Sequence, residues 1–331
     1  METQLFYDIQ MQHGIIWDWR VAADLFFGGV GVGAFLFALA LSRYADRRYL
    51  PLARTAAVIA PLAVIVGLSL LFWKLGYKSH VYQMGLNLSN GSVMWWGAFI
   101  QGLFVAIAIV FAILLISPDK GLGRLIPGFI GARFVGWAGA PVALAVGIYH
   151  GLLLSVLTSH PLWASGSMVM ASVLLFIITG IGAALFLHGL LKMLAGYSDE
   201  EGDPATYATG LKTTGYVLIA AIAFMLLNLG AWWLDLYYGS ETSRAALEAA
   251  LANYGTLLAV VGIALGLVLP LLLALFAVNR AAEPRPGTSP FLAFTLAGIL
   301  LLAGGFAIRY AAVFGGQETP PVATFATLSK V

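Results

Sequence analysis

Ionisable side chains are rare inside the long apolar segments of this 331-residue sequence, and most of them gather toward one side. Asp24 lies about one turn into the first apolar segment, and Tyr149 and His150 lie about two turns from the end of the fourth. An ionisable group inside a bilayer is costly, so each such residue is a candidate for function. A carboxylate, a phenol and an imidazole predict a site where a bound molecule exchanges protons and hydrogen bonds.

Each of these residues also has a simpler explanation that the sequence leaves open. An ion pair between Asp24 and Arg20 near the lipid headgroups is the simpler role for the carboxylate. A hydrogen bond between helices is the simpler role for Tyr149 or His150. Because neighbouring residues point in different directions around a helix, we expect only one of Tyr149 and His150 to line a pocket.

The composition explains which elements hold these residues. The chain is 61% hydrophobic and only 10% charged, whereas a soluble domain carries roughly 25% charged residues. Apolar runs of about 20 residues predict membrane-spanning helices rather than barrel strands. The sequence thus predicts an all-α polytopic membrane protein, with residues 1–331 forming a single integral membrane domain. We predict spans near residues 20–42, 52–76, 93–117, 134–157, 165–191, 211–237, 254–279 and 290–314.

The absence of cysteine restricts the redox groups that this protein can hold. A chain without cysteine offers no thiolate for an iron–sulfur cluster and forms no disulfide. A b-type haem needs two facing histidines at matching depth, but His150 and His188 fall near opposite faces of the membrane. We therefore expect no haem and no metal site. The net charge of +2 does not suggest nucleic acid as a partner.

The distribution of Lys and Arg predicts the orientation. Most of the 17 basic residues fall in the odd-numbered loops, so these loops are expected on the cytoplasmic side. Both termini, Asp24, Tyr149 and His150 are then expected near the outer, periplasmic face. On the same face, residues 240–248 predict a short helix that starts at a Ser or Thr cap. Inside the first span, Gly29 and Gly33 have the spacing that lets two membrane helices approach closely.

Several segments resemble the NrfD/PsrC family, the membrane subunits of polysulfide reductase-like respiratory complexes. The similarity is in aromatic, polar and glycine-rich motifs that keep the family's order and spacing, although Val93 replaces a family proline and His150 stands where threonine is usual. The matching segments are Trp17–Gly33, Ser92–Gly97, Gly147–Ser155, Pro161–Trp163 and Ile308–Gln317.

The resemblance implies a haem-free subunit that reacts with menaquinone or ubiquinone and is not catalytic alone. It also implies a bacterial or archaeal inner-membrane location and a periplasmic partner, a four-cluster ferredoxin-like iron–sulfur subunit that serves a molybdopterin catalytic subunit. The family's quinone pocket carries over to Asp24 and Tyr149. With their neighbours His150 and Arg20, these residues form the candidate cofactor-binding set, of which Asp24, Tyr149 and His150 are the candidate catalytic residues.

Two other functions remain open from the residues alone. A small-solute transporter is one of them, although the centres of the spans lack the ionisable groups that coupled transport commonly uses. A structural membrane anchor without quinone chemistry is the other. Quinone binding to the complex would separate the proposed subunit from both.

Overall fold

The computed structural model describes residues 17–43, 50–74, 93–117, 128–157, 159–195, 204–281 and 289–318. Residues 1–16 and 319–331 lie outside these ranges, and so does the stretch 77–92 between the second and third predicted spans. The helices are α2 (Trp19–Arg43), α3 (Leu50–Lys74), α5 (Val93–Ile116), α7 (Gly128–Ser155), α8 (Gly166–Ala195), α9 (Pro204–Tyr238), α10 (Glu241–Thr256), η2 (Leu257–Val268), α11 (Leu269–Ala281) and α12 (Ser289–Gly315).

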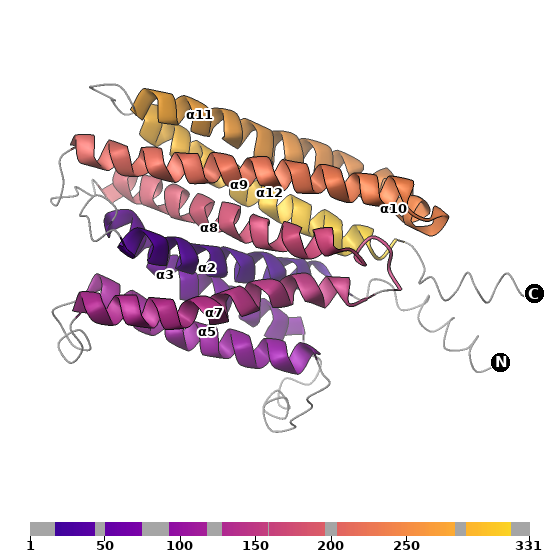
Figure 1. Cartoon of the computed structure of the whole chain (residues 1–331), viewed down its shortest axis with the longest axis horizontal. Helices are drawn as coiled ribbons and strands as arrows, with labels where there is room; N and C mark the ends of the chain where they lie inside the picture. Colours follow the sequence, from indigo (N-terminus) through magenta and orange to yellow (C-terminus); the bar gives the residue numbers. More distant parts are fainter. Residues whose placement is uncertain are drawn as a thin grey trace, which may run out of the picture.

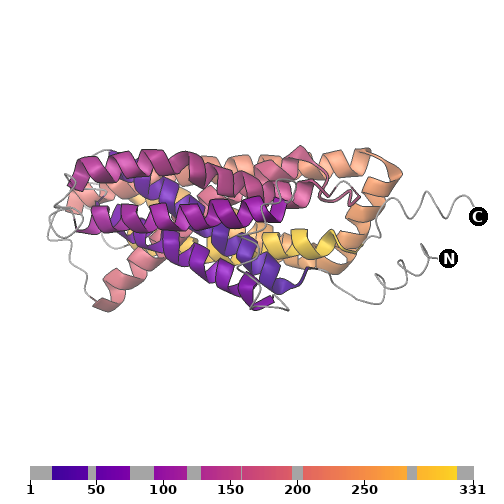
Figure 2. The same ribbon diagram turned by 90° about the horizontal axis from the view of Figure 1, so that it is seen from below.

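Within the described residues, eight helices are long and apolar enough to cross a membrane, and each predicted span overlaps one of them. The all-α polytopic fold is therefore confirmed. These segments are helical because a backbone in lipid must form its hydrogen bonds internally. In Figure 2 the long helices run in roughly one common direction, as a membrane bundle requires, and α10 turns across them at the right.

The helices form two rings of four. In the first ring α2 packs on α3, α3 on α5, α5 on α7 and α7 on α2. In the second, α8 packs on α9, α9 on α11, α11 on α12 and α12 on α8. Figure 1 shows the first ring as the lower half of the molecule and the second as the upper half. Helix α2 packs on α8 and α12, so it joins the two rings.

Glycine makes the closest contact between the rings. A Cβ atom added to Gly33 of α2 would meet the carbonyl oxygen of Phe176 and would lie 3.1 Å from the Cα of Gly180 on α8. A Cβ on Gly29, one turn earlier, would meet the Phe176 ring. The prediction that Gly29 and Gly33 permit close helix approach is thus confirmed.

The seventh span corrects one prediction. Helix α10 begins where expected, because the Ser240 hydroxyl caps it by accepting a hydrogen bond from the Ser243 amide at 3.1 Å. The short helix predicted at residues 240–248 is thus confirmed, but it is longer than predicted and runs without a break into the seventh span, since helix continues from Glu241 to Ala281. Residues 249–254 are mostly Ala and Leu, which favour a helix, and no proline interrupts them. The middle of this long helix is the π-helix η2.

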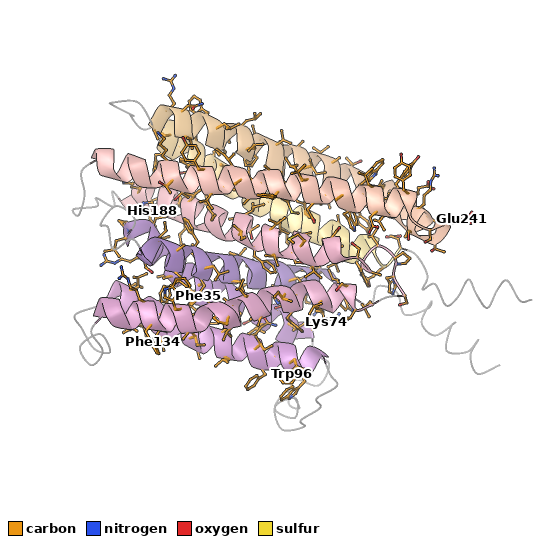
Figure 3. All side chains as sticks on the ribbon, viewed as in Figure 1. Phe35, Lys74, Trp96, Phe134, His188 and Glu241 are labelled. Atoms are coloured by element: carbon orange, nitrogen blue, oxygen red, sulfur yellow. The ribbon has the colours of Figure 1, made fainter. Side chains whose placement is uncertain are left out.

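Both ends of the described chain meet at one end of the bundle, which we call the terminal end. Gln317, just after α12, accepts a hydrogen bond from the Trp17 amide at 2.9 Å and donates one to the Trp17 carbonyl at 3.0 Å. The ring of Trp17 stacks on Trp163, with centroids 5.6 Å apart. In Figure 3, Trp96 and Glu241 lie toward this end and His188 lies toward the other.

Candidate functional site

Asp24 is buried in the first ring, one turn into α2 and close to the terminal end. Only 4% of the residue is exposed. A Cβ on Gly67 of α3 would lie 2.9 Å from the Asp24 Oδ1 atom, so glycine at this position makes room for the carboxyl group. Among the described residues, this Oδ1 atom has no hydrogen-bond partner. A buried carboxyl oxygen without a partner is suited to accept a proton or a hydrogen bond from a bound molecule.

Tyr149 brings a hydroxyl group toward the same part of the ring from α7. Its ring packs so closely on α5 that a Cβ on Gly97 would meet the Tyr149 hydroxyl. Helix α7 also packs on α2, which carries Asp24. The structure therefore places these two predicted site residues in the same ring, each beside a glycine that makes room for it, Gly67 for Asp24 and Gly97 for Tyr149.

His150 points away from α5 toward the boundary between the rings. It is fully buried, and its ring lies 5.9 Å from the Phe176 ring of α8 in an edge-on contact. Gly28, one turn below Asp24 on α2, makes room for it, because a Cβ there would lie 3.1 Å from the His150 Nε2 atom. Neither ring nitrogen has a partner among the described residues. Tyr149 and His150 thus face different helices, as their spacing predicts.

Arg309 of α12 and Ser172 of α8 extend this cluster into the second ring. Arg309 is 3% exposed, and its Nη1 atom donates a hydrogen bond to the Ser172 hydroxyl at 2.9 Å. Its guanidinium carbon lies 5.7 Å from the centre of the Phe176 ring, whose edge-on neighbour is His150. The Nε and Nη2 atoms have no partner in the described part of the chain.

The sequence analysis did not assign Arg309 to the site. A lone arginine inside the last apolar span was the available signal. Ser172 carried no signal, because serine is common inside membrane helices and its neighbour across the bundle is unknown before folding.

Arg20 occupies a different position from the other predicted site residues. Its Nη2 atom forms a salt bridge with Asp18 at 2.7 Å, and its guanidinium lies 5.8 Å from the Trp73 ring. Burial raises the pKa of Asp18, but hydrogen bonds from Arg20 and the charges of Lys74 and Arg20 outweigh it, so the pKa is lowered. The structure therefore pairs Arg20 with Asp18 at the start of α2, and not with Asp24.

His160, in the connection between α7 and α8, makes the terminal end sensitive to acid. Its Nδ1 atom lies 2.9 Å from the Gly316 carbonyl oxygen. Burial lowers the pKa of His160, and the hydrogen bond to Gly316 only partly offsets this. A pKa below the unfolded value of about 6.5 stabilises the fold above that pH, and this stability is lost as the pH falls through the folded pKa.

We expect the thermal unfolding midpoint of the purified protein to fall as the pH is lowered below about 6.5, and to fall less in a His160→Gln variant. The glutamine keeps a hydrogen-bonding group near Gly316 but does not titrate. Differential scanning fluorimetry of both proteins from pH 8 to pH 5 measures the effect. Parallel pH curves for the two proteins would contradict the role of His160.

The fold and the site together define the class: a polytopic all-α membrane protein in which three buried titratable side chains, Asp24, His150 and Arg309, lie toward the terminal end of the bundle. The described residues contain no group of three His, Asp or Glu side chains that could hold a metal ion. The model of the family described as "Polysulphide reductase, NrfD" matches residues 8–321, and the chain belongs to this family.

Relatives of similar length support the assignment. The chain is 27% identical over 329 residues to the C subunit of polysulfide reductase from Wolinella succinogenes, covering 95% of this chain and 98% of the relative. It is 25% identical over 323 residues to protein NrfD from Escherichia coli, covering 92% and 96% of the two proteins. It is 23% identical over 329 residues to an NrfD homologue from Haemophilus influenzae, covering 92% and 95%. The resemblance inferred from the motifs is thus confirmed.

Proposed function

We propose that this protein is the quinone-reactive membrane subunit of a respiratory oxidoreductase complex. The observation that carries the proposal is the buried Asp24 carboxyl group, whose Oδ1 atom has no partner among the described residues. Burying such a group in a bilayer costs free energy, so its presence points to a function such as proton exchange or ligand binding. Membership of the NrfD family supports the same role.

A quinone suits this position because of its two-part chemistry. Its apolar tail enters from the lipid, while its ring oxygens need hydrogen bonds and exchange two protons for every two electrons. In the proposed mechanism the Tyr149 hydroxyl donates a hydrogen bond to one ring oxygen, and Asp24 takes or returns a proton. His150 is the further proton-exchanging group in the proposal, and water at the terminal end accepts the protons when quinol is oxidised or supplies them when quinone is reduced.

Electrons must reach the quinone from another protein, since this one has no cysteine to ligate an iron–sulfur cluster. We propose an iron–sulfur partner of the four-cluster ferredoxin type, bound at the terminal end and connected to a molybdopterin catalytic subunit. One relative is named as the C subunit of polysulfide reductase, which supports a complex of several proteins. The distribution of Lys and Arg supports an outer, periplasmic location for this end in a bacterial or archaeal inner membrane.

Binding of a quinone analogue to the purified native complex tests the proposal directly. We expect saturable binding, weakened roughly threefold to tenfold by Tyr149→Phe, which removes one hydrogen bond and little else. Isothermal titration calorimetry measures the affinity, and mass spectrometry identifies the copurified subunits. A Phe291→Tyr variant, which adds a hydroxyl group near the opposite end of the bundle, is the matched control.

Two outcomes would contradict the proposal in different ways. Equal affinity in the wild type and in Tyr149→Phe would remove Tyr149 from the site. No binding and no redox partner would reject the quinone role and favour a transporter.

A further inference from the structure

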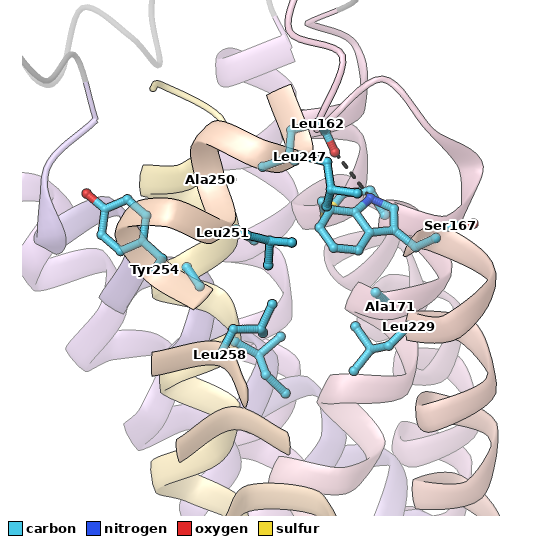
Figure 4. Close-up of a pocket in the computed structure, with 14 residues that line it drawn as sticks. Leu162, Ser167, Ala171, Leu229, Leu247, Ala250, Leu251, Tyr254 and Leu258 are labelled. Atoms are coloured by element: carbon cyan, nitrogen blue, oxygen red, sulfur yellow. Dashed lines mark hydrogen bonds between the residues drawn. The ribbon is translucent and has the colours of Figure 1, made fainter. Parts of the chain in front are cut away.

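An apolar groove runs along the second ring, on a face that the proposed quinone site does not use. It lies between α9 on one side and α10 and η2 on the other, and encloses about 310 Å³. A smaller pocket of about 50 Å³ adjoins it and shares Leu229, Leu247 and Leu258 with it. Figure 4 shows this smaller pocket, with Leu251 and Leu258 on one side of it and Leu229 of α9 on the other.

The groove is long and narrow. On the α10–η2 side its lining extends from Leu247 to Ile263, a rise of about 24 Å along a helix. The hydrocarbon layer of one leaflet is about 15 Å deep. A helix of that length would displace on the order of 1,000 Å³, so the groove is too small for a partner helix. A single hydrocarbon tail is the narrower occupant that the volume of about 310 Å³ admits.

The α9 side of the groove contains a glycine that leaves it unobstructed. Gly230 of α9 lines it, and a Cβ added to Gly230 would meet no atom within 4 Å. Gly255, on the opposite wall, would meet only Leu251 of its own helix, at 3.6 Å or more. Both sides of the groove thus carry a glycine, and neither position has a side chain that would narrow it.

A pair of oppositely charged side chains lies beside the groove, at the side closest to the terminal end of the bundle. The Arg244 Nε atom lies 3.1 Å from a Glu248 oxygen, and both side chains are more than half exposed. The Arg244 guanidinium also lies 4.5 Å above the ring of Tyr237. Tyr237 stacks in turn on Trp233, which lines the groove, with ring centroids 4.9 Å apart. The charged pair is therefore continuous with the apolar wall.

We propose that this groove binds a zwitterionic phospholipid of the phosphatidylethanolamine type. One acyl tail lies along η2, Arg244 donates hydrogen bonds to the phosphate, and Glu248 accepts them from the ammonium group. The neighbouring opposite charges match a headgroup that carries both signs. A quinone ring is uncharged and would make no ionic contact with either member of this pair.

Lipid retention by the purified full-length protein tests the proposal. Wild-type protein and variants are exchanged into detergent micelles containing equal amounts of dioleoyl phosphatidylethanolamine, dioleoyl phosphatidylglycerol and menaquinone, and native mass spectrometry counts the bound molecules. Gly230→Phe places a ring in the groove from a position where the added Cβ would meet no atom within 4 Å, and we expect it to reduce retained phosphatidylethanolamine by about tenfold or more. Arg244→Gln, which keeps the groove but removes the cation, is expected to reduce it by a similar factor.

Gly102→Phe is the matched control, because Gly102 is an exposed glycine of α5 whose added Cβ would also meet nothing within 4 Å. We expect this variant to retain phosphatidylethanolamine as the wild type does. Equal retention in Gly230→Phe and Gly102→Phe would overturn the site. Equal retention of phosphatidylglycerol would overturn the headgroup assignment, and menaquinone held in place of phospholipid and lost in Gly230→Phe would overturn the lipid identity.

Discussion

Replacement of Asp24 by asparagine is expected to lower quinone-dependent turnover of the assembled complex by about a hundredfold or more, the usual effect of removing a general acid or base. Asparagine has nearly the same shape but cannot take up a proton. Asp24 faces Gly67, and its Oδ1 atom has no partner to lose among the described residues, so the helix packing is expected to survive. Steady-state oxidation or reduction of a soluble quinone analogue by the purified complex measures the effect.

Asp18→Asn is the control for this experiment. Asp18 precedes α2, and its partner is Arg20, not Asp24. We expect the Asp18→Asn complex to keep most of its turnover. Wild-type turnover in Asp24→Asn would reject Asp24 as the proton-exchanging group. Equal losses in both variants, accompanied by loss of the copurified subunits, would indicate a defect in assembly.

Replacement of Gly33 by alanine is expected to have the largest effect on folding. The added methyl group would meet the Phe176 carbonyl and lie 3.1 Å from the Gly180 Cα, so backbone atoms of α8 obstruct it. Overpacking of a core commonly costs about 1–3 kcal/mol, and rigid backbone cannot move aside as a side chain does. We expect several kcal/mol of destabilisation, a large share of the roughly 5–15 kcal/mol that holds a typical protein folded.

Size-exclusion chromatography and thermal unfolding of detergent-purified protein measure this loss. Gly102→Ala is the control, since its new methyl group meets no atom within 4 Å. It is expected to fold at least as well as the wild type, because alanine favours a helix by up to about 1 kcal/mol over glycine. Equal unfolding midpoints for the two alanine variants would show that the α2–α8 contact tolerates a side chain.

The sequence by itself was sufficient to predict the eight spans and the family. Long apolar runs must become helices in lipid, because the bilayer offers no other partner for their backbone groups. The position of Asp24 along the first span, and the spacing of Gly29 and Gly33, were equally readable, since distance along a helix follows directly from residue number. These are properties of one helix at a time.

Only the tertiary structure decided which residues face one another. The spans are apolar nearly all round, so their periodicity does not show which side faces which neighbour. The space that Gly67 leaves for Asp24, the bond from Arg309 to Ser172 and the unobstructed side of the groove at Gly230 all depend on helix rotation and packing. The continuous helix from Glu241 to Ala281 was missed for a related reason, because polarity marks where the polypeptide leaves the membrane but not where its helix ends.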